Sequence, residues 1–296
     1  MPHFRNYGDR GIFHTQCQHH GLQPVRAVGD HGLYGLCGHE FYAAHFVNSQ
    51  KGWIVGQQGE ILHTSDGGKT WKFQHSRTQA DLNKVYFGNE LAGIVVGDKG
   101  TVLTTVDGGK HWVPQKSGTE NDILGMSLAE DGLVAVGEGG IVMKYSLDDS
   151  TPLEIPKPTL ATQVKEEPKP EVIEGNWKVA RQNSWQTDFN DVYFVTHDIG
   201  WAVGSSGIIA YTTDGGKQWK PQSVSTESLE NPATVNLQFV TFIDQSTGWV
   251  LGDRGIVLYT ENGGKKWLQS KVSENATEIS RFQCIQFIDS KHGWIG

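Results

Sequence analysis

The stretch that decides the fold is residues 52–71, which read GWIVGQQGEILHTSDGGKTW. It contains a Gly-Trp step with a short apolar run, a Gly-x-x-Gly hairpin, an alternating strand and a Thr-x-Asp-Gly-Gly-Lys-x-Trp turn. Nine of the ten tryptophans in the chain fall on copies of the Gly-Trp step or of this turn. A unit that recurs at a fixed period cannot bury its own apolar face, so its copies must stack on one another.

Both motifs recur along the chain. The Gly-Trp step is repeated at Gly52-Trp53, Gly200-Trp201, Gly248-Trp249 and Gly293-Trp294. The turn is repeated from Thr64 to Trp71, Thr105 to Trp112, Thr212 to Trp219 and Thr260 to Trp267, with Asn262 in the acidic position of the last copy. Each unit spans about 40 to 48 residues and reads as four short antiparallel strands joined by tight turns. We therefore expect an all-β fold, a β-propeller of six to seven four-stranded blades.

One unit is longer than the others and contains a segment of different composition. Residues 150–174 hold five of the ten prolines, mixed with Lys and Glu, and cannot bury enough apolar surface to become ordered. We expect a disordered insertion that splits the turn of this unit. Its acidic half then lies at Asp148 and its aromatic half at Trp177. Loop tips tolerate such insertions.

The first part of the chain fits the repeat less well than the rest. We assign residues 41–296 to the propeller and residues 1–40 to a degenerate repeat. Residues 8–15 read GDRGIFHT and match residues 252–260, GDRGIVLYT, so they are candidate ring-closing strands. Residues 25–32, VRAVGDHG, are a candidate for an eroded seventh blade. A chain truncated at both ends is the alternative explanation.

Composition excludes several classes of protein. The net charge of -8 and a pI near 5.8 argue against nucleic-acid binding, which needs clustered Lys and Arg. No stretch approaches the roughly 18 consecutive apolar residues of a membrane-spanning helix. The three cysteines cannot form a closed disulfide framework. The first residues lack the apolar core of a secretory signal, which as written predicts a cytoplasmic chain unless the start is misplaced.

The repeated turn has a structural interpretation. An Asp carboxylate can accept hydrogen bonds from N–H groups of its own tight turn, the glycines allow positive φ, and the Trp packs on a neighbouring strand or blade. We therefore assign a structural role, and no catalytic one, to Asp66, Trp71, Asp107, Trp112, Asp148, Trp177, Asp214, Trp219, Asn262 and Trp267. No phosphate-binding loop, nucleophile elbow or dinucleotide fingerprint is present, so no cofactor is expected.

These turns resemble the Asp-box of bacterial neuraminidase-type repeats. The longer repeat, in which the Gly-Trp step, the Gly-x-x-Gly hairpin and the turn follow at fixed spacing, resembles the photosystem II stability and assembly factor family over residues 41–296. The resemblance implies a seven-bladed propeller, exported from the cytoplasm, that holds a membrane-protein subunit during assembly without catalysis. It therefore implies a protein partner for a monomeric chain that neither binds nucleic acid nor spans a membrane.

In photosynthetic members of that family an arginine-rich patch contributes to the partner contact. The candidates here are Arg181, Arg254 and Arg281, which are scattered along an acidic chain. This departure favours a relative from a bacterium that need not be photosynthetic.

Two other functions remain open at this point. A carbohydrate-active propeller, sialidase-like or another glycosidase, would need convergent carboxylates, and Asp188 with Asp191 is a candidate pair. Alignment of Asp191 with Lys84 of another repeat favours a solvated turn for this pair. The further alternative is an extracellular ligand-binding receptor fragment.

Histidines and cysteines gather in the first 45 residues. Cys17, His19, Cys37 and His39 could supply zinc ligands, although their spacing is not that of an established zinc motif. A His-rich segment without metal, or an erroneous gene start, is the competing interpretation.

Overall fold

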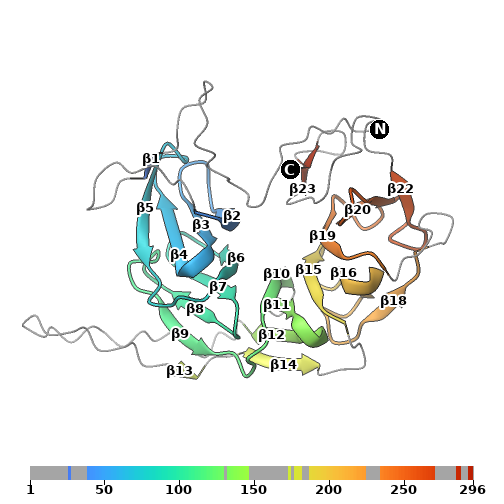
Figure 1. Ribbon diagram of the computed structural model, residues 1–296, viewed down its shortest axis with the longest axis horizontal. Helices are drawn as coiled ribbons and strands as arrows, with labels where there is room; N and C mark the ends of the chain where they lie inside the picture. Colours follow the sequence, from blue (N-terminus) through green and yellow to red (C-terminus); the bar gives the residue numbers. More distant parts are fainter. Residues whose placement is uncertain are drawn as a thin grey trace, which may run out of the picture. The chain divides into compact units, whose positions relative to one another are not determined.

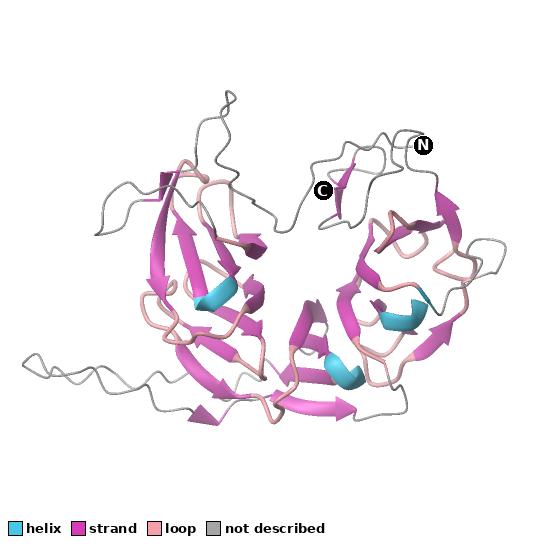
Figure 2. Cartoon of the chain, viewed as in Figure 1, coloured by secondary structure: helices cyan, strands magenta, loops and turns pink. Residues whose placement is uncertain are grey.

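In the computed structural model the regular structure consists almost entirely of short strands, most of them paired antiparallel (Figures 1 and 2). The described residues are 26–27, 39–129, 132–146, 173–174, 177–181, 187–224, 234–270, 285–287 and 293–295. They fall into two compact units. The first unit contains β1 to β9 and β13, and the second contains β10 to β12 and β14 to β24.

Five sheets share one four-stranded antiparallel plan, in which each strand pairs with the next in sequence. Blade 1 is formed by β2 (Phe41–Phe46), β3 (Gly52–Gly56), β4 (Glu60–Thr64) and β5 (Thr70–His75). Blade 2 is formed by β6 (Leu82–Phe87), β7 (Gly93–Gly97), β8 (Val102–Thr105) and β9 (Val113–Lys116). Both belong to the first unit.

The second unit contains three further blades. Blade 3 consists of β10 (Ile123–Ala129), β11 (Gly132–Gly137), β12 (Val142–Ser146) and β14 (Trp177–Arg181). Blade 4 consists of β15 (Phe189–Phe194), β16 (Gly200–Gly204), β17 (Ile209–Thr212) and β18 (Lys220–Gln222). Blade 5 consists of β19 (Leu237–Phe242), β20 (Gly248–Gly252), β21 (Val257–Thr260) and β22 (Leu268–Ser270). The pair β23 (Ile285–Phe287) and β24 (Gly293–Ile295) follows. The predicted all-β propeller architecture is confirmed.

The second strand of each blade is buried along its whole length. Every residue of β3, β7, β11, β16 and β20 is buried. These strands are continuous apolar runs bounded by glycines, the pattern of a strand covered on both faces. The glycines are needed sterically: a Cβ on Gly56 would come within 2.1 Å of the Glu40 carbonyl oxygen. This strand therefore lies in the core of its sheet, with the outer strands more exposed.

Two ends can be distinguished on each blade by the turns that connect its strands. The Gly-x-x-Gly hairpin between the second and third strands lies at one end, which we call the hairpin end. The Asp-box turn between the third and fourth strands lies at the other, which we call the Asp-box end. At the Asp-box end the turn also bonds the connection between the first two strands: Gly67 N donates to Gln50 O at 2.8 Å, and Gly263 N to Ser246 O at 2.8 Å.

Two short strands are added to the outer edges of blades 1 and 2. β1 (Arg26–Ala27) runs parallel to β5, and β13 (Ile173–Glu174) runs parallel to β9. Residues 26 and 27 thus pair with blade 1, and residues 173 and 174, at the end of the expected insertion, pair with blade 2. The assignments of residues 1–40 to a degenerate repeat and of residues 150–174 to a disordered insertion stay predictions. The outermost strand of a blade offers free backbone groups, which explains why distant segments pair there.

The insertion expected within the repeat of blade 3 is visible in the strand pairing of that blade. β12 and β14 pair antiparallel, with Tyr145 opposite Trp177, although residues 147–176 separate them in sequence. Residues 147–172 lie outside the described residues, as do residues 1–25 and 28–38. Helical structure in the described chain consists of the short 3-10 turns η1 (Gln57–Gly59), η2 (Glu138–Gly140) and η3 (Ser205–Gly207), and none of these could cross a bilayer.

Candidate functional site

The Asp-box turn of blade 1 forms a closed set of hydrogen bonds. The Thr64 hydroxyl accepts from the N–H of Gly68 at 2.8 Å and donates to Asp66 Oδ1 at 2.9 Å. The other side of the Asp66 carboxylate is bound by Thr70, whose N–H donates to Oδ1 at 2.9 Å and whose hydroxyl donates to Oδ2 at 2.6 Å. The Asp and Thr side chains thus replace the backbone partners that a tight turn leaves unsatisfied.

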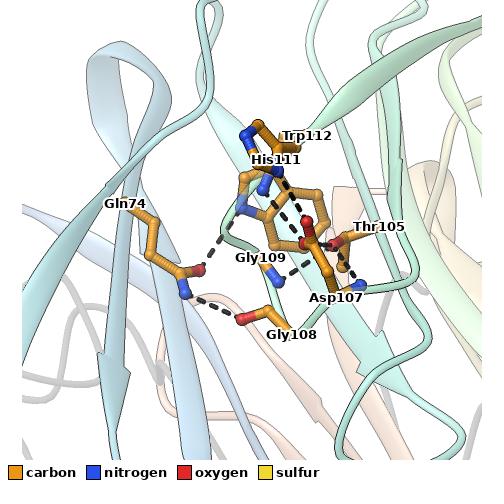
Figure 3. A network of polar contacts seen from close by, with 7 residues as sticks. All are labelled: Gln74, Thr105, Asp107, Gly108, Gly109, His111 and Trp112. Atoms are coloured by element: carbon orange, nitrogen blue, oxygen red, sulfur yellow. Dashed lines mark hydrogen bonds and ion pairs between the residues drawn. The ribbon is translucent and has the colours of Figure 1, made fainter. Parts of the chain in front are cut away.

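The same arrangement is repeated in three further described turns. Asp107 Oδ1 accepts from His111 N at 3.0 Å, Asp214 Oδ1 from Gln218 N at 2.8 Å, and Asn262 Oδ1 from Lys266 N at 2.9 Å. In each turn a Thr hydroxyl two residues earlier donates to the same oxygen. Figure 3 shows the turn of blade 2, where His111 also contacts Asp107 Oδ2 through its ring. Asp148 lies outside the described residues.

These hydrogen bonds lower the pKa values of the carboxyl groups. The hydroxyl and N–H of Thr70 hold the pKa of Asp66 at about 2, below its ordinary 3.8. For Asp107 and Asp214, partial burial raises the pKa, but hydrogen bonds from the residues of the turn outweigh it and the net shift is downward. A general acid needs a raised pKa and a free proton-transfer position, so these carboxylates are unsuited to acid catalysis at neutral pH.

The tryptophans pack between neighbouring blades. Trp53 of blade 1 stacks on Phe87 of blade 2 with ring centroids 3.5 Å apart, and Trp112 meets the same Phe87 edge-on at 5.8 Å. In the second unit Trp201 stacks on Phe242 at 3.5 Å, and Trp267 meets Phe242 edge-on at 5.9 Å. The two tryptophan motifs therefore meet on one phenylalanine, at the end of the next blade's first strand.

A glutamine joins each of these stacks to the following Asp-box turn. Gln74 at the end of β5 donates to Gly108 O at 2.8 Å and accepts from Trp112 Nε1 at 3.3 Å (Figure 3). Gln222 makes the equivalent bonds to Gly263 O at 3.0 Å and from Trp267 Nε1 at 3.3 Å. A buried indole N–H needs such an acceptor.

Sequence reasoning missed these glutamines, although a signal for them exists. Gln74 and Gln222 each stand three residues after an Asp-box tryptophan, in the steps Trp-Lys-Phe-Gln and Trp-Lys-Pro-Gln. Gln115 occupies the same place in Trp-Val-Pro-Gln but instead donates to Thr104 Oγ1 at 2.9 Å. The repeated Trp-x-x-Gln spacing therefore marks the position, but it does not determine the partner of the glutamine side chain.

The hairpin end presents a different feature, a set of non-glycine residues with positive φ. These are Gln58 (φ 54°), Lys99 (φ 55°), Ser206 (φ 59°) and Arg254 (φ 55°), each directly before a hairpin glycine. All four side chains are exposed. The left-handed conformation costs a non-glycine residue roughly 1–2 kcal/mol, and such residues concentrate at functional sites. Arg254, a candidate partner contact from the sequence, thus stands at a strained and exposed hairpin tip.

The carboxylate pair raised from the sequence is not a solvated turn. Asp191 is buried within β15, opposite Val203, and its Oδ2 accepts from Val240 N of blade 5 at 3.1 Å. Asp188 accepts from Gly139 N of blade 3 at 2.8 Å. The expectation of a solvated turn at Asp191 is wrong. This residue lies inside strand β15, and its side chain points to the next blade, where it binds Val240 N. Both carboxylates bind backbone N–H groups of neighbouring blades.

The remaining candidates lie only in part within the described residues. His39 contacts Glu60 through its ring nitrogen Nδ1, while Cys17, His19 and Cys37 lie outside the described residues. Within the described part of the chain, His, Cys, Asp and Glu side chains form no group of three that could hold a metal ion. Arg181 ends β14 opposite Val142, at the hairpin end of blade 3, and Arg281 lies outside the described residues.

Repeated four-stranded sheets, Asp-box turns and interblade tryptophans together define a β-propeller of the Asp-box class. A family model described as photosynthesis system II assembly factor YCF48 matches residues 37–112, 169–276 and 224–296. These matches cover more than half of the sequence, so the chain belongs to this family. No curated protein matches it.

Solved structures share the fold at low sequence identity. A structure titled YCF48 bound to D1 peptide is similar with a TM-score of 0.61 and 20% identity, covering 87% of this chain and 74% of that one. YCF48 from Cyanidioschyzon merolae aligns at a TM-score of 0.49 and 15% identity over 87% of this chain and 92% of its own. AFV00434, an ancestral GH74 enzyme, is similar with a TM-score of 0.55 and 11% identity over 86% of this chain and 37% of that one.

Proposed function

We propose that this chain is a non-enzymatic scaffold that binds a segment of a partner protein, and that the partner is a membrane-complex subunit of the D1 type. Membership of the assembly-factor family is the observation that carries this proposal. The D1 peptide in the solved YCF48 structure suggests the class of ligand. A propeller suits such a role because its loops form broad faces on a rigid framework.

The chemistry of the carboxylates supports a role without catalysis. Asp66, Asp107 and Asp214 each accept hydrogen bonds from their own turn and stand at equivalent places in blades 1, 2 and 4. An active site instead needs unlike groups that converge on one substrate. Asp188 and Asp191 bind backbone N–H groups, so the glycosidase alternative gains no support from this pair. The similarity to a GH74 enzyme concerns the fold.

The hairpin end is the part of each blade that we assign to the partner. Arg254 is exposed at the tip of the β20–β21 hairpin, and Arg181 ends its strand at the same end of blade 3. An exposed guanidinium such as that of Arg254 can donate hydrogen bonds to a carboxylate or to carbonyl groups of an extended peptide. The backbone strain at Arg254 is consistent with retention of this side chain for binding rather than for stability.

A direct binding experiment tests this function. We would measure the affinity of the full chain for a labelled D1 peptide by fluorescence anisotropy, and compare it with a scrambled peptide of equal charge. Specific binding is the expected result. A pull-down from membranes of the source organism would then identify the natural client. Equal affinity for both peptides, together with no membrane subunit recovered above background, would contradict the proposal.

A matched pair of variants tests the hairpin end. Arg254→Gly removes the guanidinium and relieves the positive φ, whereas Ser206→Gly makes the same backbone change in blade 4 without loss of charge. We expect Arg254→Gly to weaken peptide binding about tenfold, the loss of one charged hydrogen bond, and Ser206→Gly to leave it unchanged. If both variants bind as tightly as the native chain, the partner contact lies elsewhere.

A further inference from the structure

The Asp-box turn of blade 5 departs from the others at one position. Asn262 replaces the aspartate and is followed by Gly263, and this is the only Asn-Gly step in the sequence. The side chain of Asn262 is exposed at the Asp-box end. Asn-Gly steps are chemically labile, because a glycine offers no side chain to hinder attack of its nitrogen on the preceding amide.

The amide carbonyl of Asn262 is held by two hydrogen-bond donors. Its Oδ1 accepts from the Thr260 hydroxyl at 3.1 Å and from Lys266 N at 2.9 Å. Attack on Cγ places negative charge on this oxygen. Donors already aimed at an oxygen where charge develops lower the barrier of acyl transfer. The two donors that bind an aspartate in the other turns therefore activate the amide of Asn262 as an electrophile.

The nucleophile of the same reaction is restrained. The N–H of Gly263 donates to Ser246 O at 2.8 Å, in the connection between β19 and β20. That connection is itself ordered by Asp244, whose Oδ1 accepts from Ser246 N and Thr247 N, both at 2.7 Å. Gly263 can attack only after its bond to Ser246 opens. The rate of reaction therefore depends on the stability of this contact.

We propose that Asn262 is a site of spontaneous deamidation whose rate is controlled by the Gly263–Ser246 hydrogen bond. The Gly263 nitrogen loses its proton and forms a bond to Cγ of Asn262. The bond from Cγ to Nδ2 then breaks, and the nitrogen leaves as ammonia with that proton. Water adds to one carbonyl of the resulting succinimide and opens the ring to aspartate or isoaspartate. No oxidant or reductant takes part.

The two products have opposite consequences for blade 5. Aspartate at position 262 restores the side chain that accepts the same two kinds of donor in Asp66, Asp107 and Asp214. Isoaspartate inserts an extra carbon into the backbone between Thr260 and Gly264, whose N–H donates to the Thr260 hydroxyl at 2.9 Å. That insertion breaks the turn and disturbs the edge-on contact of Trp267 with Phe242. Deamidation therefore repairs or disrupts this Asp-box according to which product forms.

The test is peptide mapping by mass spectrometry of the full chain aged at pH 8, beside a synthetic peptide of residues 257–268 under the same conditions. We expect amide-to-acid conversion at Asn262 in both, with the folded chain roughly fivefold slower, as one closed hydrogen bond of about 1 kcal/mol requires. Asp244→Ala loosens the acceptor without removing either donor to Asn262, so its rate should rise to that of the peptide or above it. Gln245→Ala, an exposed change in the same connection, is the control.

Two results would overturn the proposal. One is an unmodified Asn262 in the full chain after the peptide has been fully converted. The other is a rate in the folded chain that equals that of the peptide and does not respond to Asp244→Ala. Thermal unfolding of Asn262→Asp beside the native chain tests the aspartate product by itself. This variant should unfold at the same or a higher temperature.

Discussion

The indole of Trp201 lies face to face on the ring of Phe242, with centroids 3.5 Å apart and planes inclined by 11°. Trp201 belongs to the second strand of blade 4 and Phe242 to the first strand of blade 5. The same pairing joins Trp53 to Phe87 in the first unit. An aromatic stack between successive sheets is therefore a repeated means of holding one blade against the next.

Removal of the central ring should destabilise the second unit strongly. Phe242 is 2% exposed and contacts both Trp201 and Trp267. We expect Phe242→Ala to lower the free energy of unfolding by about 3–5 kcal/mol, through lost burial and the cavity left between two indoles. Urea unfolding followed by tryptophan fluorescence measures this. The control is Phe46→Ala at the equivalent position of blade 1, where the ring is 44% exposed and the loss should be much smaller. Equal losses would refute a special role for the stack.

The interblade glutamine should contribute through hydrogen bonds. Gln222→Leu keeps most of the side-chain volume but leaves Trp267 Nε1 and Gly263 O without the partner they have in this structure. A buried polar group left unsatisfied costs about 1–3 kcal/mol, so a loss of that size is expected in chemical denaturation. Gln269→Ala, an exposed change on β22, should have little effect. A neutral Gln222→Leu would show that solvent replaces the glutamine.

The acidity of Asp66 should depend on Thr70. The Thr70 hydroxyl and N–H lower the pKa of Asp66 to about 2 from 3.8. A carboxyl whose pKa falls on folding stabilises the native state at pH values above the unfolded pKa. This contribution is lost as the pH falls from 3.8 through 2. Thr70→Ala should move the pKa of Asp66 upward, which carbon NMR of the side-chain carboxyl would detect. An unchanged titration midpoint would show that the hydroxyl has no part in the shift.

Close approach between blades 3 and 4 should make Gly125 intolerant of a side chain. A Cβ at this position would come within 2.8 Å of the Asp191 Cα and 2.9 Å of Val136 Cγ2. Because backbone on β15 cannot move aside easily, Gly125→Ala should cost about 1–3 kcal/mol, the usual penalty of overpacking. Gly88→Ala is the matched control, since its nearest atom would be Tyr86 Cε1 at 3.9 Å. Differential scanning calorimetry should show a lower melting temperature for the first variant alone.

Local features of the fold could be predicted because they are encoded within single repeats. The threonine and aspartate side chains of each turn bond to residues at most four positions away, as Thr64, Asp66 and Thr70 do. The alternation of buried and exposed residues along the strands follows from the same short-range pattern. So does the pairing of the strands on either side of the insertion in blade 3. The sequence also carried the Trp-x-x-Gln signal, but without a partner it could not be interpreted.

Only the tertiary structure decided which residues of neighbouring blades contact one another. Gln74 reaches Gly108 across 34 positions, and Asp191 reaches Val240 across 49. Buried Asp191 and the edge strands at residues 26–27 and 173–174 could not be predicted, because burial and edge pairing depend on how separate sheets pack. The sequence by itself determined the repeated blade and its Asp-box turns, since their bonds close within a few residues. The contacts between blades were decided by packing, since the free energy that selects them arises only when distant repeats are brought together.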